Sequence, residues 1–377
     1  MKKSLIFIYP DYHCSFIYRD MLRKMGWKAD IYIPHGYPSD LLFGTPDVVG
    51  PMSKSPKILD QIILGVKTEI LYLRILSKYR YHFFHGNLEH FTLFENSRFF
   101  SKLFGKSFRI NLQLAKLLRR KIIFLPSGAP DEEMPNVIAA LGNDEEGVAV
   151  RDSRAMAVHF KVINKYSDLN IGFGVLDSSQ YKATHIKYKS IDLSLWRPDL
   201  EVPKDYQLPQ SSKIRILHSF MYQKARMESQ GGNIKGSLYV QQAIAQLISE
   251  GYEIEALSFD GVKSSDYRFY QIQADIIVEE LIRGSWGSTA VECMALGKPV
   301  VTYIRSDWEK RYYELFPDTN PLPLVNANKW TIYYVLKHLL DDLSSLHRIG
   351  SQSREFAIKH LDPEVNVKEF AKLIQRL

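Results

Sequence analysis

The sequence is poor in cysteine and contains no long hydrophobic run. Cys14 and Cys293 are its two cysteines in 377 residues, and their wide separation matches no disulfide or metal-binding spacing, which indicates a reducing compartment. The first apolar run stops at Pro10, too early for a signal peptide, and no run approaches the length of a membrane-spanning helix. We therefore expect a cytoplasmic protein, either soluble or peripherally bound to the inner face of the membrane.

Several motifs that would define a cofactor or metal enzyme are also missing. No G-x-G-x-x-G follows the first predicted strand, and the Walker spacing is absent, which weighs against a nicotinamide, flavin or P-loop enzyme. No D-x-D stands at the end of a predicted strand, so we expect no metal ion and no cofactor. Neither a Ser/His/Asp nor a Cys/His triad can be assembled from neighbouring residues.

Acidic residues are absent from 96–130, within a chain of formal net charge +7. Basic residues are frequent there: Arg98, Lys102, Lys106, Arg109, Lys116, Arg119, Arg120 and Lys121. Within 97–109 they alternate with phenylalanine, a composition typical of segments that lie on anionic membranes. We predict that 97–109 contacts such a surface, the alternative being a solvated or core-packed helix. No nucleic-acid motif is present, so nucleic acid is not an expected partner.

The composition is that of a globular protein, with 45% hydrophobic and 24% charged residues, and the length suits two domains. Short apolar runs that read as strands alternate with helical stretches, which predicts an α/β fold with parallel sheets. The predicted strands lie in 4–10, 29–34, 81–86, 121–128, 147–152, 214–219, 252–259 and 274–279, and the clearest helices in 15–25, 110–120 and 236–250. We expect a first domain over 1–190, a proline-containing linker over 191–212 and a second domain over 213–350. Helices over 351–377, with a break near Pro363, end the chain.

The stretch GSWGSTAVECMALGKPVV, residues 284–301, combines a glycine turn, a short apolar helix and a buried strand. Gly297 is placed to end the helix and Pro299 prevents its continuation. The free N–H groups and the dipole at the start of such a helix form a natural phosphate site. The competing interpretation is a capping box, in which Thr289 caps the helix and Glu292 bonds back to the cap amide.

A second candidate phosphate ligand precedes the helix predicted over 236–250. Lys235 and Gly236 stand at its start, after a loop that contains Gly231 and Gly232. A lysine at the mouth of a helix N-terminus combines a point charge with backbone amides, which suits a diphosphate. The alternative is a surface lysine on a solvated loop.

Together, IKGS at this helix start and ADIIVEELIRGSWGSTAVECMALGKPVV resemble the donor domain of GT-B glycosyltransferases, especially the family 4 retaining enzymes. The resemblance is specific over about 214–305, and the first half of the chain matches in architecture alone. It implies two Rossmann-like domains facing across a cleft, with the C-terminal helix returning to the first domain. It also implies that Lys235 binds the diphosphate of a nucleotide sugar, that Glu292 binds the ribose, and that the amides around Gly287, Ser288 and Thr289 face the diphosphate.

The resemblance fails at one position. The family pattern has a glutamate eight residues before Glu292, where this sequence has Gly284; Glu279 and Glu280 are nearby but out of register. That glutamate contacts the donor sugar in the family. We predict that Arg283 or Trp286 lines the corresponding space.

Two histidines are candidates for the acceptor side. His85 ends the predicted strand YHFFHG, and His13 is predicted to end the first strand in YPDYHC. A histidine at the carboxyl end of a strand can exchange a proton or bond a sugar hydroxyl. We assign a catalytic role to His85 together with Lys235, and an acceptor-side role to His13.

The sequence thus predicts a metal-independent glycosyltransferase of the hexosyltransferase type. Its donor is a nucleoside diphosphate sugar, and its acceptor is a glycan or lipid-linked glycan of cell-surface polysaccharide or glycolipid synthesis. Two alternatives stay open: a sugar-nucleotide epimerase of the same fold, and a non-catalytic nucleotide-sugar-binding protein.

Overall fold

The computed structural model describes residues 3–11, 13–34, 42–51, 57–86, 88, 108–126, 153–172, 183–218, 235–319 and 321–377. The described chain forms two compact units. The first contains the residues up to Tyr188 together with Val367–Leu377, and the second is Lys189–Asn366.

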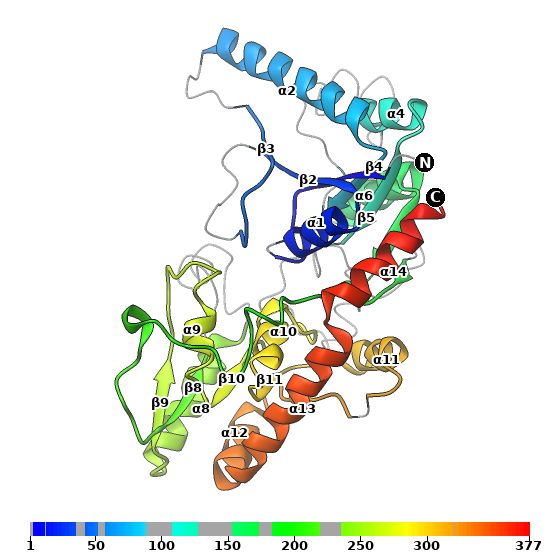
Figure 1. The fold of residues 1–377 in the computed structure, drawn as a ribbon. Helices are drawn as coiled ribbons and strands as arrows, with labels where there is room; N and C mark the ends of the chain where they lie inside the picture. The colour runs from blue at the N-terminus through cyan, green and yellow to red at the C-terminus, as the bar shows by residue number, and fades with distance from the viewer. Residues whose placement is uncertain are drawn as a thin grey trace. The chain divides into compact units, whose positions relative to one another are not determined.

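The first unit is built on a seven-stranded sheet with strand order β3-β2-β1-β4-β5-β6-β7. Figure 1 labels β2, β3, β4 and β5 of this sheet. Every strand pairing in it is parallel. The strands are β1 (Ser4–Ile8), β2 (Lys28–Ile33), β3 (Val48–Val49), β4 (Tyr81–His85), β5 (Lys121–Leu125), β6 (Leu169–Gly172) and β7 (Thr184–His185). The strand order changes direction between β1 and β4, and ligands of open parallel sheets bind beside such a point, at the carboxyl ends of the strands.

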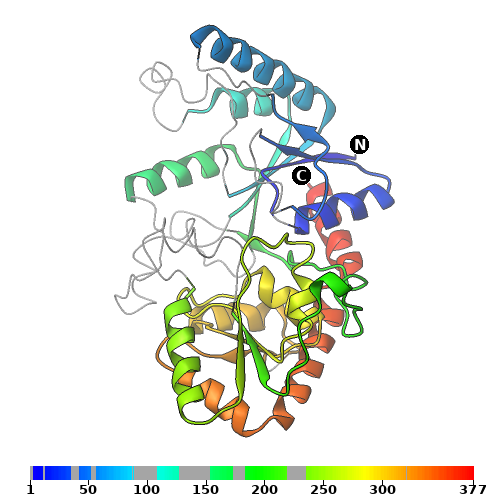
Figure 2. The ribbon, with the colours of Figure 1, turned by 90° about the vertical axis from the view of Figure 1, so that its left-hand side faces the viewer.

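Helices cover both faces of this sheet, as Figures 1 and 2 show from two directions. The helices are α1 (Cys14–Lys24), α2 (Ile58–Lys78), α4 (Ile110–Leu117), α6 (Ser153–Tyr166) and α14 (Pro363–Gln375). On one face, α2, α4 and α6 share a hydrophobic core with Ile6, Ile8 and Phe84. On the other face, Tyr18 of α1 and Phe370 of α14 pack with Phe83 and Tyr188. Because both faces are covered, central strands contain apolar runs that are buried throughout, such as 5–8 in β1 and 122–125 in β5.

The second unit has a five-stranded parallel sheet of order β12-β11-β10-β8-β9. Its strands are β8 (Ile214–Leu217), β9 (Ile254–Leu257), β10 (Ile276–Val278), β11 (Val300–Thr302) and β12 (Val325–Asn326). Its helices are η3 (Lys204–Tyr206), α8 (Ser237–Ser249), α9 (Arg268–Gln271), α10 (Ser288–Ala295), α11 (Ser306–Leu315), α12 (Ile332–Asp341) and α13 (Ser344–His360). Here the order changes direction between β8 and β10.

The α/β architecture predicted from the alternating runs is confirmed, as is the break in the terminal helices, since α13 ends at His360 and α14 begins at Pro363. The strand predicted in 147–152 lies outside the described residues. The segment 191–212, predicted as a linker, packs against the second unit. The Tyr206 carbonyl oxygen accepts a hydrogen bond from Gln273 Nε2 at 2.9 Å, and Leu208 N–H donates to Gln273 Oε1 at 2.8 Å.

Candidate functional site

The carboxyl ends of β8 and β10 bring together groups that are distant in sequence. His218 follows β8, and its Nδ1 lies 2.8 Å from the Val278 carbonyl oxygen at the end of β10. Its Nε2 lies 2.8 Å from Ser237 Oγ, in the first residue of α8. Burial lowers the pKa of His218 to about 4, so the ring is neutral at pH 7. A neutral ring that donates a hydrogen bond from Nδ1 accepts one at Nε2 from the Ser237 hydroxyl. This bond fixes the start of α8 beside the carboxyl ends of the strands. Sequence reasoning missed this histidine, whose one signal was its place at a strand end.

Lys235 and Gly236 stand where the sequence places them, directly before α8. Gly236 has φ +78° and is the N-cap residue of this helix. A Cβ at this position would lie 2.8 Å from Leu281 Cβ, so the close approach to the segment after β10 requires glycine. The same approach lets Leu281 N–H donate to the Lys235 carbonyl oxygen at 3.2 Å. The lysine is thereby held beside the carboxyl end of β10.

The helix α10 begins at Ser288, with Gly287 as its N-cap residue and no side-chain cap. Its first intrahelical bond is from Val291 N–H to the Gly287 carbonyl oxygen at 3.4 Å. The N–H groups of Ser288 and Thr289 therefore precede the intrahelical ladder, and both residues are partly exposed. The C-terminal end has Gly297 at φ +71°, with Gly297 N–H bonded to Met294 O and Lys298 N–H to Cys293 O. This confirms the predicted role of Gly297 as a helix stop.

A carboxylate joins the lysine to the start of α10. Glu279, directly after β10, accepts a hydrogen bond from Lys235 Nζ at Oε1 over 2.8 Å. Its Oε2 accepts from Gly287 N–H at 3.0 Å and from Thr302 Oγ1 at 3.3 Å. Lys235 and the Gly287 amide are thus within hydrogen-bond reach of one side chain. The sequence predicted that these two groups share a site, and the fold brings them together; the amide of Gly287 is already bonded to Glu279.

The turn between β10 and α10 explains why glycine occupies position 284. Gly284 has φ +76°, and a Cβ there would lie 2.0 Å from Arg305 Cγ. The buried Arg305 side chain therefore fills the space that a glutamate side chain would enter. Glu280 holds the turn from inside, accepting the Arg283 and Gly284 N–H groups at 3.0 and 2.9 Å.

Two further predictions about this turn can be compared with the structure. Trp286, predicted to line the donor space, is 4% exposed and stacks on Tyr312 with ring centroids 3.9 Å apart. That prediction is wrong, because the indole belongs to an aromatic core with Phe316 and Phe356. Arg283 is partly exposed, and its donor-binding role stays a prediction.

Glu292 lies inside α10 and is not part of a cap. Its Oε2 accepts a hydrogen bond from Gln271 Nε2 at 2.6 Å, and burial raises the pKa of its carboxyl to about 7. The capping-box interpretation is wrong, because the helix begins two residues earlier than that motif requires and Gly287, not Thr289, occupies the cap position. Glu292 consequently lies beyond the first turn of the observed helix. Its assignment to the ribose stays a prediction.

In the first unit, His85 is the last residue of β4, as predicted, and is partly exposed. It lies beside the point where the strand order changes direction. His13 does not end a strand, since β1 ends at Ile8; it is the N-cap residue of α1 and is 2% exposed. Its ring packs on Phe43 with centroids 4.9 Å apart.

Several predictions fall on residues outside the described ranges. They include the glycines of the 219–234 loop and most of the segment 97–109, of which Phe108 and Arg109 are described. Arg109 N–H donates to Tyr166 Oη of α6 at 3.0 Å. Across the described ranges, no helix is both long and apolar enough to cross a bilayer. No group of three His, Cys, Asp or Glu residues suited to a metal ion is found in the same ranges; metal independence stays a prediction.

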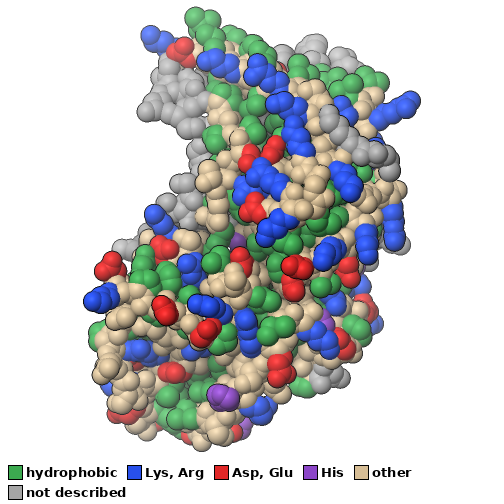
Figure 3. Space-filling view, in the orientation of Figure 1, with side chains coloured by type: hydrophobic (Ala, Val, Ile, Leu, Met, Phe, Trp, Pro, Cys, Tyr) green, Lys and Arg blue, Asp and Glu red, His purple; other side chains and the backbone are tan. Residues whose placement is uncertain are grey.

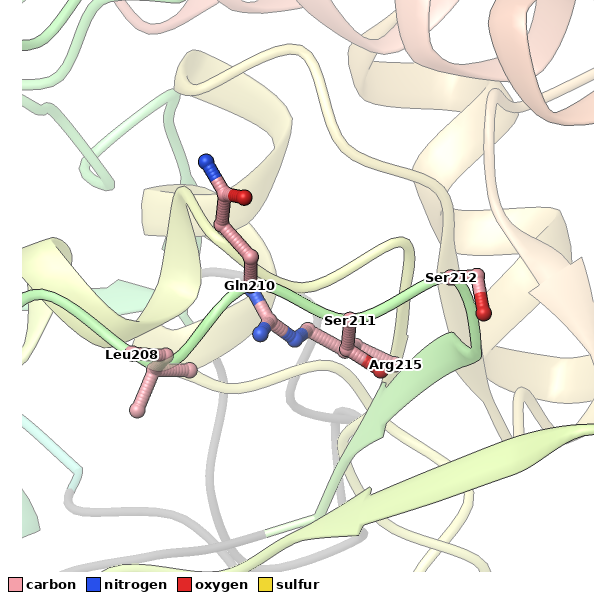
Figure 4. A pocket seen from close by; sticks show the side chains of 5 residues that line it. All are labelled: Leu208, Gln210, Ser211, Ser212 and Arg215. Atoms are coloured by element: carbon pink, nitrogen blue, oxygen red, sulfur yellow. The ribbon is translucent and has the colours of Figure 1, made fainter.

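A separate hollow of about 550 Å³ lies at the amino end of β8, lined by Leu208, Gln210, Ser211, Ser212 and Arg215 (Figure 4). Arg215 Nε donates to Glu255 Oε2 at 2.9 Å. Parallel sheets bind ligands at the carboxyl ends of their strands, so this hollow lies at the wrong end of the sheet for a donor site.

Comparison with solved structures gives matches over almost the whole chain. Sucrose-phosphate synthase from Thermosynechococcus elongatus has a TM-score of 0.60 and 13% identity, covering 99% of this chain and 98% of its own. Anabaena HepE in complex with UDP-glucose has a TM-score of 0.56 and 12% identity, covering 99% and 100%. WaaG, a glycosyltransferase involved in lipopolysaccharide biosynthesis, has a TM-score of 0.56 and 10% identity, covering 98% and 99%. The chain has the GT-B fold. No protein-family model and no curated protein sequence matches it.

Proposed function

We propose that this GT-B protein is a glycosyltransferase that moves a hexose-type sugar from a nucleoside diphosphate sugar to a glycan or lipid-linked acceptor. The pathway we propose is the synthesis of a cell-surface polysaccharide or glycolipid. One observation carries the proposal. The Lys235 ammonium and the start of α10 meet at the carboxyl ends of β8 and β10, joined through Glu279. A lysine and helix-terminal amides at such a point suit a diphosphate.

The identity of the donor is supported by the structural neighbours. The HepE structures are complexes with UDP, with UDP and glucose, and with UDP-glucose. We therefore propose a uridine diphosphate sugar, with a guanosine diphosphate sugar as the next candidate. Glu292, at the buried side of the same helix, is proposed to accept the ribose hydroxyls.

In the proposed reaction an acceptor hydroxyl oxygen forms a bond to the anomeric carbon. The bond from that carbon to the β-phosphate oxygen breaks, the oxygen keeps the electron pair, and the hydroxyl proton passes to His85 or to the leaving phosphate. Catalysis is then mainly positioning of the two substrates and neutralisation of the departing diphosphate by Lys235 and the amides of Ser288 and Thr289. For the acceptor side we propose His85 as the proton-exchanging group, supported by its place at the end of β4, and His13 as a weaker candidate.

We also propose peripheral contact with an anionic membrane, through 97–109 and through α2. Along α2, large apolar side chains between 43% and 68% exposed recur every three or four residues: Leu59, Ile62, Ile63, Val66, Ile70 and Leu73. At 100° per residue they form one stripe, with Lys67, Arg74 and Lys78 along one edge of it. Figure 3 shows Lys and Arg side chains in a row along this helix, beside hydrophobic ones. An apolar stripe edged by cations is the arrangement of helices that lie on anionic lipid.

The proposed function is tested by binding and turnover. Calorimetry with UDP, UDP-glucose and GDP is expected to show binding, weakened by K235A and unaffected by K213A. Lys213 is a good control because it lies at the opposite end of the same sheet, in an exposed pair with Glu253. Transfer to an added acceptor would support a transferase. Donor epimerisation without acceptor would favour an epimerase, and binding without any turnover a non-catalytic protein. Absence of nucleotide binding would refute all three.

A further inference from the structure

The donor site already contains a carboxylate of the chain itself. The Glu279 side chain is 1% exposed and accepts hydrogen bonds from Lys235 Nζ and from Gly287 N–H. Lys235 is one of the donors that the proposed function offers to the diphosphate, and Gly287 is the N-cap residue directly before the other two, Ser288 and Thr289. The packing is close, since a Cβ on Gly287 would lie 2.6 Å from Glu279 Oε1. A diphosphate that reaches Lys235 therefore comes within a few ångströms of a buried negative charge.

We propose that Glu279 is a specificity-determining residue whose fixed negative charge weakens binding of the free nucleoside diphosphate more than binding of the nucleotide sugar. The inference rests on the proposed function and concerns the release of its product. The sequence pattern of the GT-B enzymes that this chain resembles has no assigned role at position 279.

The two ligands differ in charge where Glu279 acts. Transfer breaks the bond between the anomeric carbon and the β-phosphate oxygen, and that oxygen keeps the electron pair. The free diphosphate consequently carries up to one more negative charge than the nucleotide sugar, on the phosphate nearest the sugar position, since a terminal phosphate ionises a second time near pH 6. Like charges repel more strongly in a partly desolvated site than in water. The buried carboxylate thus acts most on the ligand with the additional charge.

Glu279 does not exclude the donor. A lysine ammonium group carries three N–H donors and can bond more than one acceptor at a time. The amides of Ser288 and Thr289 lie ahead of the intrahelical ladder of α10 and are not the amide that Glu279 uses. The site therefore keeps donors for a diphosphate while its net positive charge is reduced.

The experiment compares the affinities of UDP and UDP-glucose by calorimetry, without acceptor, at pH 8. The variant E279Q keeps the shape of the side chain and removes its charge. We expect UDP to bind E279Q on the order of tenfold more tightly than wild type, and UDP-glucose to gain by roughly threefold or less. The matched control is E255Q, which removes a carboxylate paired with Arg215 at the amino end of the same sheet; it is expected to leave both affinities unchanged.

If Glu279 only holds Lys235 and the turn in place, E279Q will weaken both ligands equally or leave both unchanged, and either result overturns the inference. A double variant tests the inference if E279Q alone fails to fold. K235A leaves Glu279 as an unpaired buried charge, so K235A/E279Q is expected to bind UDP more tightly than K235A, and weaker or equal binding would overturn the inference. Loss of the folded state in both Glu279 variants, followed by thermal melting, would show a structural requirement and also overturn it. Wild-type protein that binds neither nucleotide would instead refute the proposed function.

Discussion

Replacing Glu292 by glutamine separates a ligand-binding role from a structural one. The carboxyl is 8% exposed, accepts a hydrogen bond from Gln271 Nε2 at 2.6 Å, and has a pKa raised by burial to about 7. The amide has nearly the same shape and can accept the same bond at its oxygen. The substitution therefore removes the ionisable group and leaves the packing of α10 almost unchanged.

The size of the effect follows from the pKa shift. A shift from 4.5 to about 7 corresponds to about 3 kcal/mol, at 1.36 kcal/mol per pKa unit. The raised pKa means that the folded state favours the protonated carboxyl. Its contribution to stability is present in full below about pH 4.5 and is lost as the pH rises through about 7. Glu280 has a pKa raised to about 7 by burial and shows the same dependence, and E292Q leaves this second contribution in place.

The assay is urea unfolding of wild type and E292Q at pH 4.5 and at pH 8. We expect equal stability at pH 4.5 and a gain of roughly 1 to 3 kcal/mol for E292Q at pH 8. UDP affinity at pH 8 is expected to fall by about 1.5 to 3 kcal/mol, the scale of a hydrogen bond to a charged group. Glu314, exposed and paired with Arg311, is the control, and E314Q should change neither quantity by more than about 0.5 kcal/mol. Lower stability at both pH values would refute the desolvation argument, and unchanged UDP affinity would refute the ribose assignment.

Three further predictions use other parts of the structure. K235A should weaken UDP binding by about 1.5 to 3 kcal/mol in calorimetry; unchanged affinity would remove the lysine from the donor site. G284A should lower the free energy of unfolding by roughly 2 to 4 kcal/mol, because φ is +76° and Arg305 Cγ lies 2.0 Å from the new Cβ. The control G261A, at φ +74° with nothing within 4 Å, should cost only about 1 kcal/mol, and equal losses would show that Arg305 moves away freely. Wild-type protein should sediment with anionic liposomes at low salt and I62D/V66D should not, whereas wild-type protein left in the supernatant would contradict the membrane proposal.

The sequence predicted those features that depend on neighbouring residues. The runs rich in isoleucine or aromatic residues predicted β1, β2, β4 and β8, and the glycine and proline after Leu296 predicted the end of α10. Lys235 lies near Gly287 because both stand at the carboxyl ends of strands that are adjacent in a parallel sheet. Phosphate binding by these groups stays a prediction.

Features that depend on distant contacts could not be predicted in the same way. The spacing of Thr289 and Glu292, which suits a capping box, was misleading, because α10 begins directly after the turn held by Glu280, with Gly287 as its N-cap residue. Trp286 sits between glycines and resembles a ligand-facing residue, yet Tyr312 stacks on it from α11. The sequence alone does not indicate that contact. The exposed stripe of α2 was missed because an apolar helix of that length is normally assigned to the core.

The glycine at position 284 acquires a different meaning in the structure. Counted along the sequence, it is a lost glutamate and favours a binding protein without catalytic activity. In the fold, Arg305 occupies the space beside Gly284, and two carboxylates stand four and five residues earlier. Glu280 accepts two amides of the turn, while Glu279 accepts the amide of Gly287 and the ammonium of Lys235. A buried carboxylate is therefore bonded to Lys235, the lysine proposed to bind the donor, although position 284 is glycine. Glycine at position 284 therefore does not by itself favour a non-catalytic binding protein over a glycosyltransferase. Turnover of a nucleotide sugar decides between the two.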